Sequence, residues 1–382
     1  MKIVHSVHIL CAAAISLLSA IAVAATPVAT AQTIAQARVQ AASDHLYASR
    51  PVDCNGRHPQ GIRYHAQLLE TLDRANSYPR AINNSGAIVG VREGRNLTRA
   101  TLWIGRRGLD LPPVDQNISS AHGINDAGSI VGVTHDANGN LRGTRWFLGT
   151  PRYLPNLADT DLYSTAYAVN RLGKSVGFSS MPDGGEWRAA VWSGAAPRIL
   201  ASLGGRSSTA YSINDRGFAA GVSTLAGPVT IQHAALWRPD GSVQDLGTLG
   251  GSSSRAASIN NKGKVAGTSL MAGDVRSAAV VWHLGVATEL QGLGGLTSSA
   301  SGINNHDQVV GFSTTDDGQG YGTIWFNGTP VQINTLLDDE SQGFNISYGI
   351  AINDRGQIVA MLATQIPPDE AVLLTPRPCR YR

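Results

Sequence analysis

The sequence predicts an all-β fold made of seven repeats, each with four short strands, and three observations support this prediction. Glycine is abundant, at 43 of 382 residues, without a G-X-Y period, which indicates many tight turns. An Ile/Val-Asn pair followed by glycine recurs about every 45 residues. A short apolar run that ends in tryptophan follows most of these pairs, as expected for a strand.

The chain begins with a segment typical of a secretory signal peptide. Lys2 precedes an apolar run from Ile9 to Ala24, and A-x-A cleavage motifs end at residues 24 and 31. A membrane anchor is the alternative, although a run of 16 residues is short for a span. We expect cleavage after residue 24, or after residue 31, and a secreted or periplasmic mature protein without a membrane span.

Each repeat opens with a strand that ends in asparagine. Glycine follows the asparagine after three and after seven residues, except at Asp307 and Ala360. An asparagine side chain accepts a nearby backbone N–H and glycine adopts positive φ, so the pattern predicts a tight hairpin to a second strand. The asparagines are Asn83, Asn125, Asn170, Asn214, Asn260, Asn304 and Asn353.

Three of these hairpins carry aspartate directly after the asparagine, which raises the possibility of catalysis. Because other residue types hold this position in the remaining repeats, we interpret it as turn chemistry. The aspartates are Asp126, Asp215 and Asp354, and their counterparts are Asn84, Arg171, Asn261 and Asn305. Small residues before the asparagine, and the second glycine, predict that another backbone comes close, as it does near a central axis.

Units of about 45 residues with four strands match the blades of a β-propeller. The last repeat stops after its third strand, Glu370–Pro376, and an extra fourth strand, Tyr64–Leu72, precedes the first repeat. Pairing these segments would close a ring and remove two exposed edges, whereas an open array would need polar caps. We therefore expect a seven-bladed β-propeller whose last blade is completed by an N-terminal strand.

This closure also divides the chain and places its cysteines. Residues 25–62 are expected to form an N-terminal extension, residues 63–376 the repeats, and residues 377–382 a C-terminal tail. Cys54 and Cys379 flank the two segments that closure brings together. In an exported chain this favours a disulfide, and two unrelated thiols are the alternative.

The repeat motifs resemble those of the HAF family of predicted extracellular repeat proteins. The matching segments are His233–Trp237, the I-N-D-x-G-x-x-x-G hairpins and Leu246–Gly251, and the resemblance covers about four-fifths of the chain. It implies an exported repeat protein, with no established activity, cofactor or catalytic residue. Other copies replace the histidine, so a repeated histidine site is not implied. The replacements are Arg99, Arg142, Arg188 and Tyr321.

Charge and motifs argue against several functions. The net charge is +3 and no Lys/Arg-rich run is present, so no nucleic-acid partner is expected. No nucleophile elbow or zinc-protease motif occurs and the histidines are scattered, so we assign no catalytic residue, metal or cofactor. A metal site assembled from several repeats is the alternative. Asp136–Asn140 has the oxygens of a calcium loop but lacks its length, so we interpret it as a turn.

Function is expected in the loops between second and third strands, where the repeats differ. One such loop ends in Trp187, the only tryptophan outside the third-strand position, and also carries Asp183 and Glu186. An aromatic ring beside acids is typical of a recognition site, although Trp187 could instead pack onto its own blade. Asp316 and Asp317 in another loop complete the ligand-face candidates, with solvated loop tips as the alternative.

These patterns favour a non-catalytic binding protein, expected to be a monomer, whose partner is an extracellular protein or glycan. Two alternatives stay open. One is a propeller hydrolase or lyase with acids near the axial opening, and the other is a purely structural extracellular module. Acids that converge within about 6 Å would favour the enzyme, and acids dispersed around an aromatic ring would favour binding.

Overall fold

The structure, a computed structural model, describes residues 52–53, 61–70, 76–94, 97–157, 163–181, 186–194, 196–227, 231–363 and 370–380. Among these residues, no helix is long and apolar enough to cross a membrane. Strands dominate the described residues, joined there by short turns and two 3-10 helices. In this part of the chain the prediction of an all-β fold is confirmed.

Six antiparallel units of four strands follow one another along the chain, and a last sheet combines its two ends. A single parallel pairing of Ser277 with Thr297 joins the fifth and sixth units into one eight-stranded sheet. Within each unit the strands pair in sequence order. The strands are β3 (Asn76–Ile82), β4 (Ala87–Gly94), β5 (Leu97–Ile104) and β6 (Arg107–Asp110) in unit 1; β7 (Ser119–Ile124), β8 (Ser129–His135), β9 (Leu141–Phe147) and β10 (Thr150–Tyr153) in unit 2; β11 (Ser164–Val169), β12 (Ser175–Ser180), β13 (Trp187–Trp192) and β14 (Pro197–Ile199) in unit 3; β15 (Gly204–Ile213), β16 (Ala219–Leu225), β17 (Gln232–Trp237) and β18 (Val243–Asp245) in unit 4; β19 (Gly250–Ile259), β20 (Val265–Met271), β21 (Ser277–His283) and β22 (Val286–Glu289) in unit 5; β23 (Gly294–Ile303), β24 (Val309–Thr315), β25 (Gly320–Phe326) and β26 (Thr329–Gln332) in unit 6; and β1 (Val52–Asp53), β2 (Ile62–Leu68), β27 (Ile346–Ile352), β28 (Ile358–Leu362) and β29 (Ala371–Arg380) in the last sheet, which η2 (Ile333–Leu336) and η3 (Asp339–Ser341) connect to unit 6.

The last sheet pairs the N-terminal strand with the final strand. β2 runs antiparallel to β29, with Ile62 opposite Pro378 and Leu68 opposite Val372. β1 adds a short parallel pairing at the end of β29. β29 therefore extends to Arg380 and does not end at residue 376 as expected, because both N-terminal strands supply partners for its backbone.

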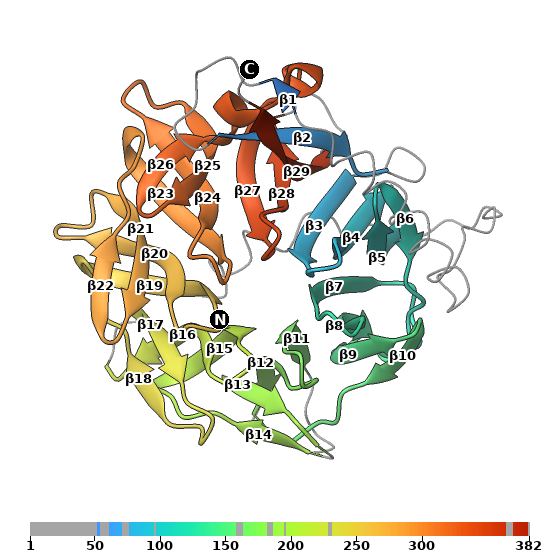
Figure 1. Ribbon diagram of the computed structural model, residues 1–382. Helices are drawn as coiled ribbons and strands as arrows, with labels where there is room; N and C mark the ends of the chain where they lie inside the picture. Colours follow the sequence, from blue (N-terminus) through green and yellow to red (C-terminus); the bar gives the residue numbers. More distant parts are fainter. Residues whose placement is uncertain are drawn as a thin grey trace.

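The units are arranged around a central axis (Figure 1). The first strand of each unit contacts the first strand of the next unit, and β27 contacts β3, so that the sheets surround a common centre. This arrangement is β-propeller-like. The loops between the second and third strands of the units, such as the β4–β5 loop, lie at one end of the sheets. The asparagine turns between the first and second strands lie at the other end.

Each turn asparagine has two roles. In Asn214 the side-chain oxygen accepts the N–H groups of Arg216 at 3.1 Å and Phe218 at 3.0 Å, which confirms the predicted turn. The side-chain nitrogen of each asparagine also donates, at 2.9–3.1 Å, to the backbone oxygen of the next asparagine. This series returns from Asn353 to Asn83, so hydrogen bonds link the repeats into a closed circle.

Two kinds of close backbone approach explain the small residues. A Cβ on Gly221 of the second strand would lie 2.0 Å from the backbone oxygen of Thr209 in its own unit, where β15 carries a bulge. A Cβ on Gly123 of a first strand would instead lie 2.7 Å from the backbone oxygen of Tyr167 in the next unit. The predicted close approach is confirmed, but only the first-strand positions face a neighbouring unit.

The third-strand tryptophans form the core between sheets, as expected, and each is at most 3% exposed. In five of them the indole N–H donates to a backbone carbonyl at the end of the preceding repeat. Trp282 is the exception among the described residues, because its Nε1 is buried without a partner. The carbonyl of Gly247 at the equivalent place accepts the Ser254 hydroxyl at 2.6 Å.

Candidate functional site

Trp187 lies at the surface, but as the first residue of β13 and not in the loop before it, where the sequence analysis placed it. Trp187 begins β13 opposite Ser180, and 40% of its surface is exposed. Beside it, Glu186 accepts hydrogen bonds at 2.8 Å from both Arg188 and Arg206. The bond from Arg188 is the main reason why the pKa of Glu186 lies below its usual range. The surface here combines an exposed indole with an ionised carboxylate that is held in place.

The second pair of predicted ligand-face acids lies in the turn between β24 and β25, across the ring from β13 (Figure 1). Asp317 accepts the Thr315 hydroxyl and the Gln319 N–H, so its carboxylate closes this turn. The Thr315 hydroxyl is the first cause of the lowered pKa of Asp317. Asp316 is exposed in the same turn. These acids therefore do not gather with the β12–β13 loop, whose Asp183 lies outside the described residues.

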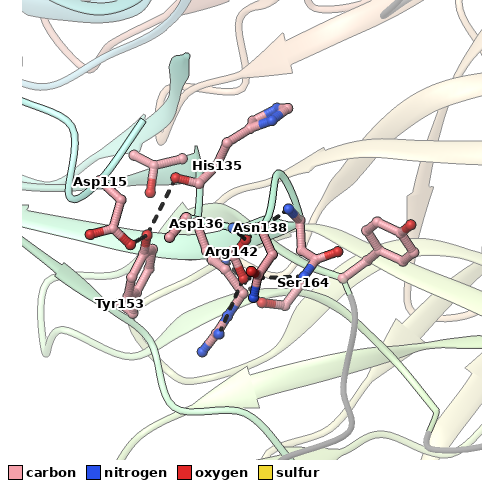
Figure 2. A network of polar contacts seen from close by, with 12 residues as sticks. Asp115, His135, Asp136, Asn138, Arg142, Tyr153 and Ser164 are labelled. Atoms are coloured by element: carbon pink, nitrogen blue, oxygen red, sulfur yellow. Dashed lines mark hydrogen bonds and ion pairs between the residues drawn. The ribbon is translucent and has the colours of Figure 1, made fainter. Parts of the chain in front are cut away.

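A polar network between units 1 and 2 was missed by the sequence analysis (Figure 2). The Tyr153 hydroxyl donates at 2.7 Å to Asp115, in the segment between β6 and β7, and the Arg142 guanidinium lies 5.0 Å from the Tyr153 ring. Asp136 accepts the N–H of Asn138 at 2.9 Å, which confirms a turn at this position. Burial raises the pKa of Tyr153, and Asp115 adds to this effect. The protonated Tyr153 hydroxyl thus ties β10 to the segment between β6 and β7.

The residues after the turn asparagines form a second series of hydrogen bonds around the axis. The backbone N–H of each donates to the side chain of its counterpart in the next repeat, as Asp215 does to Asn261 at 2.9 Å. Six of these links are present. The seventh would have to end on Arg171, whose guanidinium has no acceptor. The turn aspartates therefore link repeats, and this geometry does not favour the alternative of an acidic catalytic site at the axis.

One cluster among the described residues has the ligand types of a metal site. His65 on β2 lies 3.1 Å from Asp338 and 3.5 Å from Glu340, measured from its Nδ1. Arg377 on β29 contacts the same Asp338 oxygen at 3.0 Å. A guanidinium thus already supplies the positive charge that a cation would bring, and the cluster ties β2 and β29 to the segment before β27.

The predicted disulfide falls largely on residues whose placement is not described. Cys54 lies outside the described residues, and so does the side chain of Cys379. The backbone pairing of β1 with β29 aligns Val52 with Cys379. The disulfide therefore stays a prediction.

The fold resembles several solved structures. They include a puromycin hydrolase mutant (TM-score 0.52, 14% identity, 79% of this chain and 52% of that one). A puromycin-hydrolyzing peptidase of Mycobacterium tuberculosis has a TM-score of 0.52 at 10% identity, and the match covers 81% of this chain and 50% of that one. An acylaminoacyl peptidase of Pyrococcus horikoshii has a TM-score of 0.50 at 12% identity, with 80% of this chain and 52% of that one covered. This chain spans about half the length of each. At such identities the likeness bears on the fold alone, and it agrees with a propeller-like architecture. No protein-family model and no curated protein matches the sequence.

Proposed function

We propose that this chain is a seven-bladed β-propeller, its last blade completed by β2, which binds an extracellular protein or glycan without catalysis. The six units, the last sheet and the closed circle of asparagine hydrogen bonds support the blade number and the closure. The signal-type N-terminus supports a secreted or periplasmic location. The hairpin motifs support a place in the HAF family.

The exposed Trp187 beside the fixed carboxylate of Glu186 carries this proposal. An indole offers a large flat surface and one N–H donor, and a sugar ring or an apolar side chain can pack on it. Glu186 is already positioned by Arg188 and Arg206, so it accepts a hydroxyl or N–H from a ligand with little further ordering. Tryptophan and arginine are also the residues that most often dominate binding energy at interfaces.

A binding screen tests this function. The mature protein is applied to an immobilised glycan set and to a cell-surface protein extract, and Kd is measured for each captured ligand. Trp187→Ala is expected to weaken binding by about 30-fold or more, as loss of a central anchor does. Leu284→Ala is the control, because Leu284 is 89% exposed in the β21–β22 turn at the other end of the sheets.

Stability measurements distinguish an anchor from a core residue. An exposed ring predicts that Trp187→Ala lowers the free energy of unfolding by less than about 1 kcal/mol, whereas a core tryptophan would cost about 3–5 kcal/mol. Unchanged affinity in Trp187→Ala would contradict the proposed site, whatever the change in stability.

A further inference from the structure

A hollow of about 680 Å³ lies between units 2 and 3, at the end of the sheets that carries the asparagine turns. This volume falls in the range of small-molecule sites. The hollow is at the end opposite the β12–β13 loop, so it is separate from the surface around Trp187. Its lining includes three arginines, three large apolar residues and no carboxylate.

The side chains of three arginines at this hollow form no ion pair among the described residues. Arg145 on β9, Arg152 on β10 and Arg171 after β11 all line the hollow, and none of them forms an ion pair within the described ranges. Three positive charges line one hollow whose lining contains no carboxylate, which favours an anionic occupant.

Arg145 departs from the residue type that the other repeats have at its position. It stands directly before the third-strand tryptophan, where every other repeat has an aliphatic residue. Those residues are Leu102, Val191, Leu236, Val281, Ile324 and, before the leucine of the last repeat, Leu373. The Arg145 guanidinium donates to the Gly173 oxygen and, at 3.2 Å, to the Ser175 hydroxyl, while its Nε is buried without a partner. Its Nη2 thus serves two protein acceptors of the next unit, and no carboxylate of the described residues pairs with the guanidinium.

Arg171 is a second departure, since asparagine or aspartate holds this position in the other repeats. Because its guanidinium has no acceptor, Arg171 accounts for the one link that is missing from the second series of hydrogen bonds around the axis. Both arginines therefore replace residues that serve the fold elsewhere, and both lie at the same hollow.

The apolar part of the lining is exposed and partly strained. Phe147, Leu148 and Leu172 expose 51%, 52% and 66% of their surfaces. Leu148 adopts φ 51° in the two-residue turn between β9 and β10, and in the matching turn of unit 6 this conformation belongs to Asn327, at φ 50°. In unit 5 the same turn position holds Leu284 at φ 52°, so the strained leucine is not particular to this hollow, and its exposed side chain is what bears on binding.

We propose that this hollow binds a small organic carboxylate with an apolar body. The guanidinium groups match the planar, bidentate geometry of a carboxylate, and partial burial of Arg145 strengthens that interaction. The apolar body of the ligand packs against Phe147, Leu148 and Leu172 and removes their surface from water.

Titration calorimetry of the mature protein with octanoate, octanamide and inorganic phosphate tests the proposal. Octanoate is expected to bind saturably, and octanamide, which lacks the charge, at least about tenfold more weakly. Arg145→Leu and Arg171→Asn each install a residue found at the equivalent position of other repeats. Both are expected to fold, to keep the thermal midpoint of unfolding at or above that of the wild type, and to weaken octanoate binding at least about tenfold.

A matched pair of turn variants tests the apolar wall. Leu148→Asn removes one wall residue and should weaken octanoate binding, whereas Leu284→Asn changes the same kind of turn in unit 5, at φ 52°, and should leave binding unchanged. The proposal is overturned if octanoate shows no saturable binding up to about 10 mM, a range that includes weak fragment binding. It is equally overturned if octanamide or phosphate binds as tightly as octanoate, or if both arginine variants bind like the wild type.

Discussion

Replacing Asn214 by aspartate tests whether the asparagine circle stabilises the ring. The change keeps the side-chain oxygen that accepts the N–H groups of Arg216 and Phe218, but it removes the donor to the Asn260 backbone oxygen at 3.1 Å. A carboxylate oxygen would then face a carbonyl oxygen at a residue with only 4% of its surface exposed.

The expected effect is the sum of two terms. Loss of one hydrogen bond costs about 1 kcal/mol, and a buried carboxylate oxygen without a donor adds about 1–3 kcal/mol. The Asn260 oxygen itself keeps a second partner, the Gly263 N–H at 3.1 Å, so it is not left unpaired. We therefore expect Asn214→Asp to lower the free energy of unfolding by about 2–4 kcal/mol at pH 7.

Acid should reverse much of this loss. Burial beside a carbonyl raises the pKa of the new carboxyl group above its unfolded value of about 3.9, and the protonated group can donate to Asn260. Because the folded state then binds the proton more tightly, the deficit relative to the wild type should shrink as pH falls from 7 toward about 4.5.

Urea unfolding followed by tryptophan fluorescence, for both proteins at each pH, measures the deficit. Asn214→Ala is the control, since it loses all three hydrogen bonds and its deficit should not depend on pH. A deficit below about 1 kcal/mol at pH 7, or one that acid leaves unchanged, would refute the reasoning.

Three further predictions concern other parts of the ring. Burial lowers the pKa of His122 to about 3, so as pH falls the unfolded chain binds this proton before the folded protein does. The free energy of unfolding should therefore fall, by at most about 1.4 kcal/mol per pH unit, as pH drops below about 6.5. In His122→Phe this part of the pH dependence should vanish from unfolding curves, and its persistence would contradict the assignment. Gly221→Ala should lower the free energy of unfolding by about 3 kcal/mol, because its Cβ would meet a backbone oxygen at 2.0 Å. Gly263→Ala, at φ 84° in open space, should lower it by only about 1–2 kcal/mol. Equal losses of stability in the two variants would argue against the bulge explanation. Intact-mass analysis of exported protein should show Cys54 and Cys379 oxidised, and two free thiols would exclude the disulfide.

The elements of the repeat were predictable because their causes lie within a few residues of one another. An asparagine oxygen reaches N–H groups two and four residues on, so the hairpin at Asn214 is written into the local sequence. The spacing of the tryptophans likewise predicted that they are buried. Even the exceptions obey local rules: Asp307, which replaces the turn glycine, adopts φ 64°, a conformation that aspartate tolerates.

The surroundings of the glycine that recurs on the second strand became clear only from the register of the sheet. In the last sheet Ala360 replaces that glycine, and it pairs with Gly349, where other repeats have alanine or proline. The register thus places a glycine opposite the one alanine of the series, a pairing that neither residue reveals in the sequence alone.

The candidate sites depended still more on tertiary structure. Trp187 and Glu186 were found because they interrupt a repeat, but the two arginines that hold Glu186 come from β13 and from β15 of the next unit. Tyr153 lies on β10 and Asp115 in the segment between β6 and β7, and they share no motif, so neither carried a signal. Arg145 does interrupt the repeat, yet its meaning emerges only beside Arg171 and the hollow that they line.

The sequence by itself therefore determined the repeated hairpins, their number and their buried tryptophans, because turn chemistry and strand periodicity act between near neighbours in the chain. Tertiary structure decided which atoms of separate repeats meet. The asparagine nitrogens find partners 42–49 residues away along most of the ring, and the last closes over a separation of 270 residues. Such contacts depend on how the sheets pack around the axis, and a local pattern does not encode that geometry.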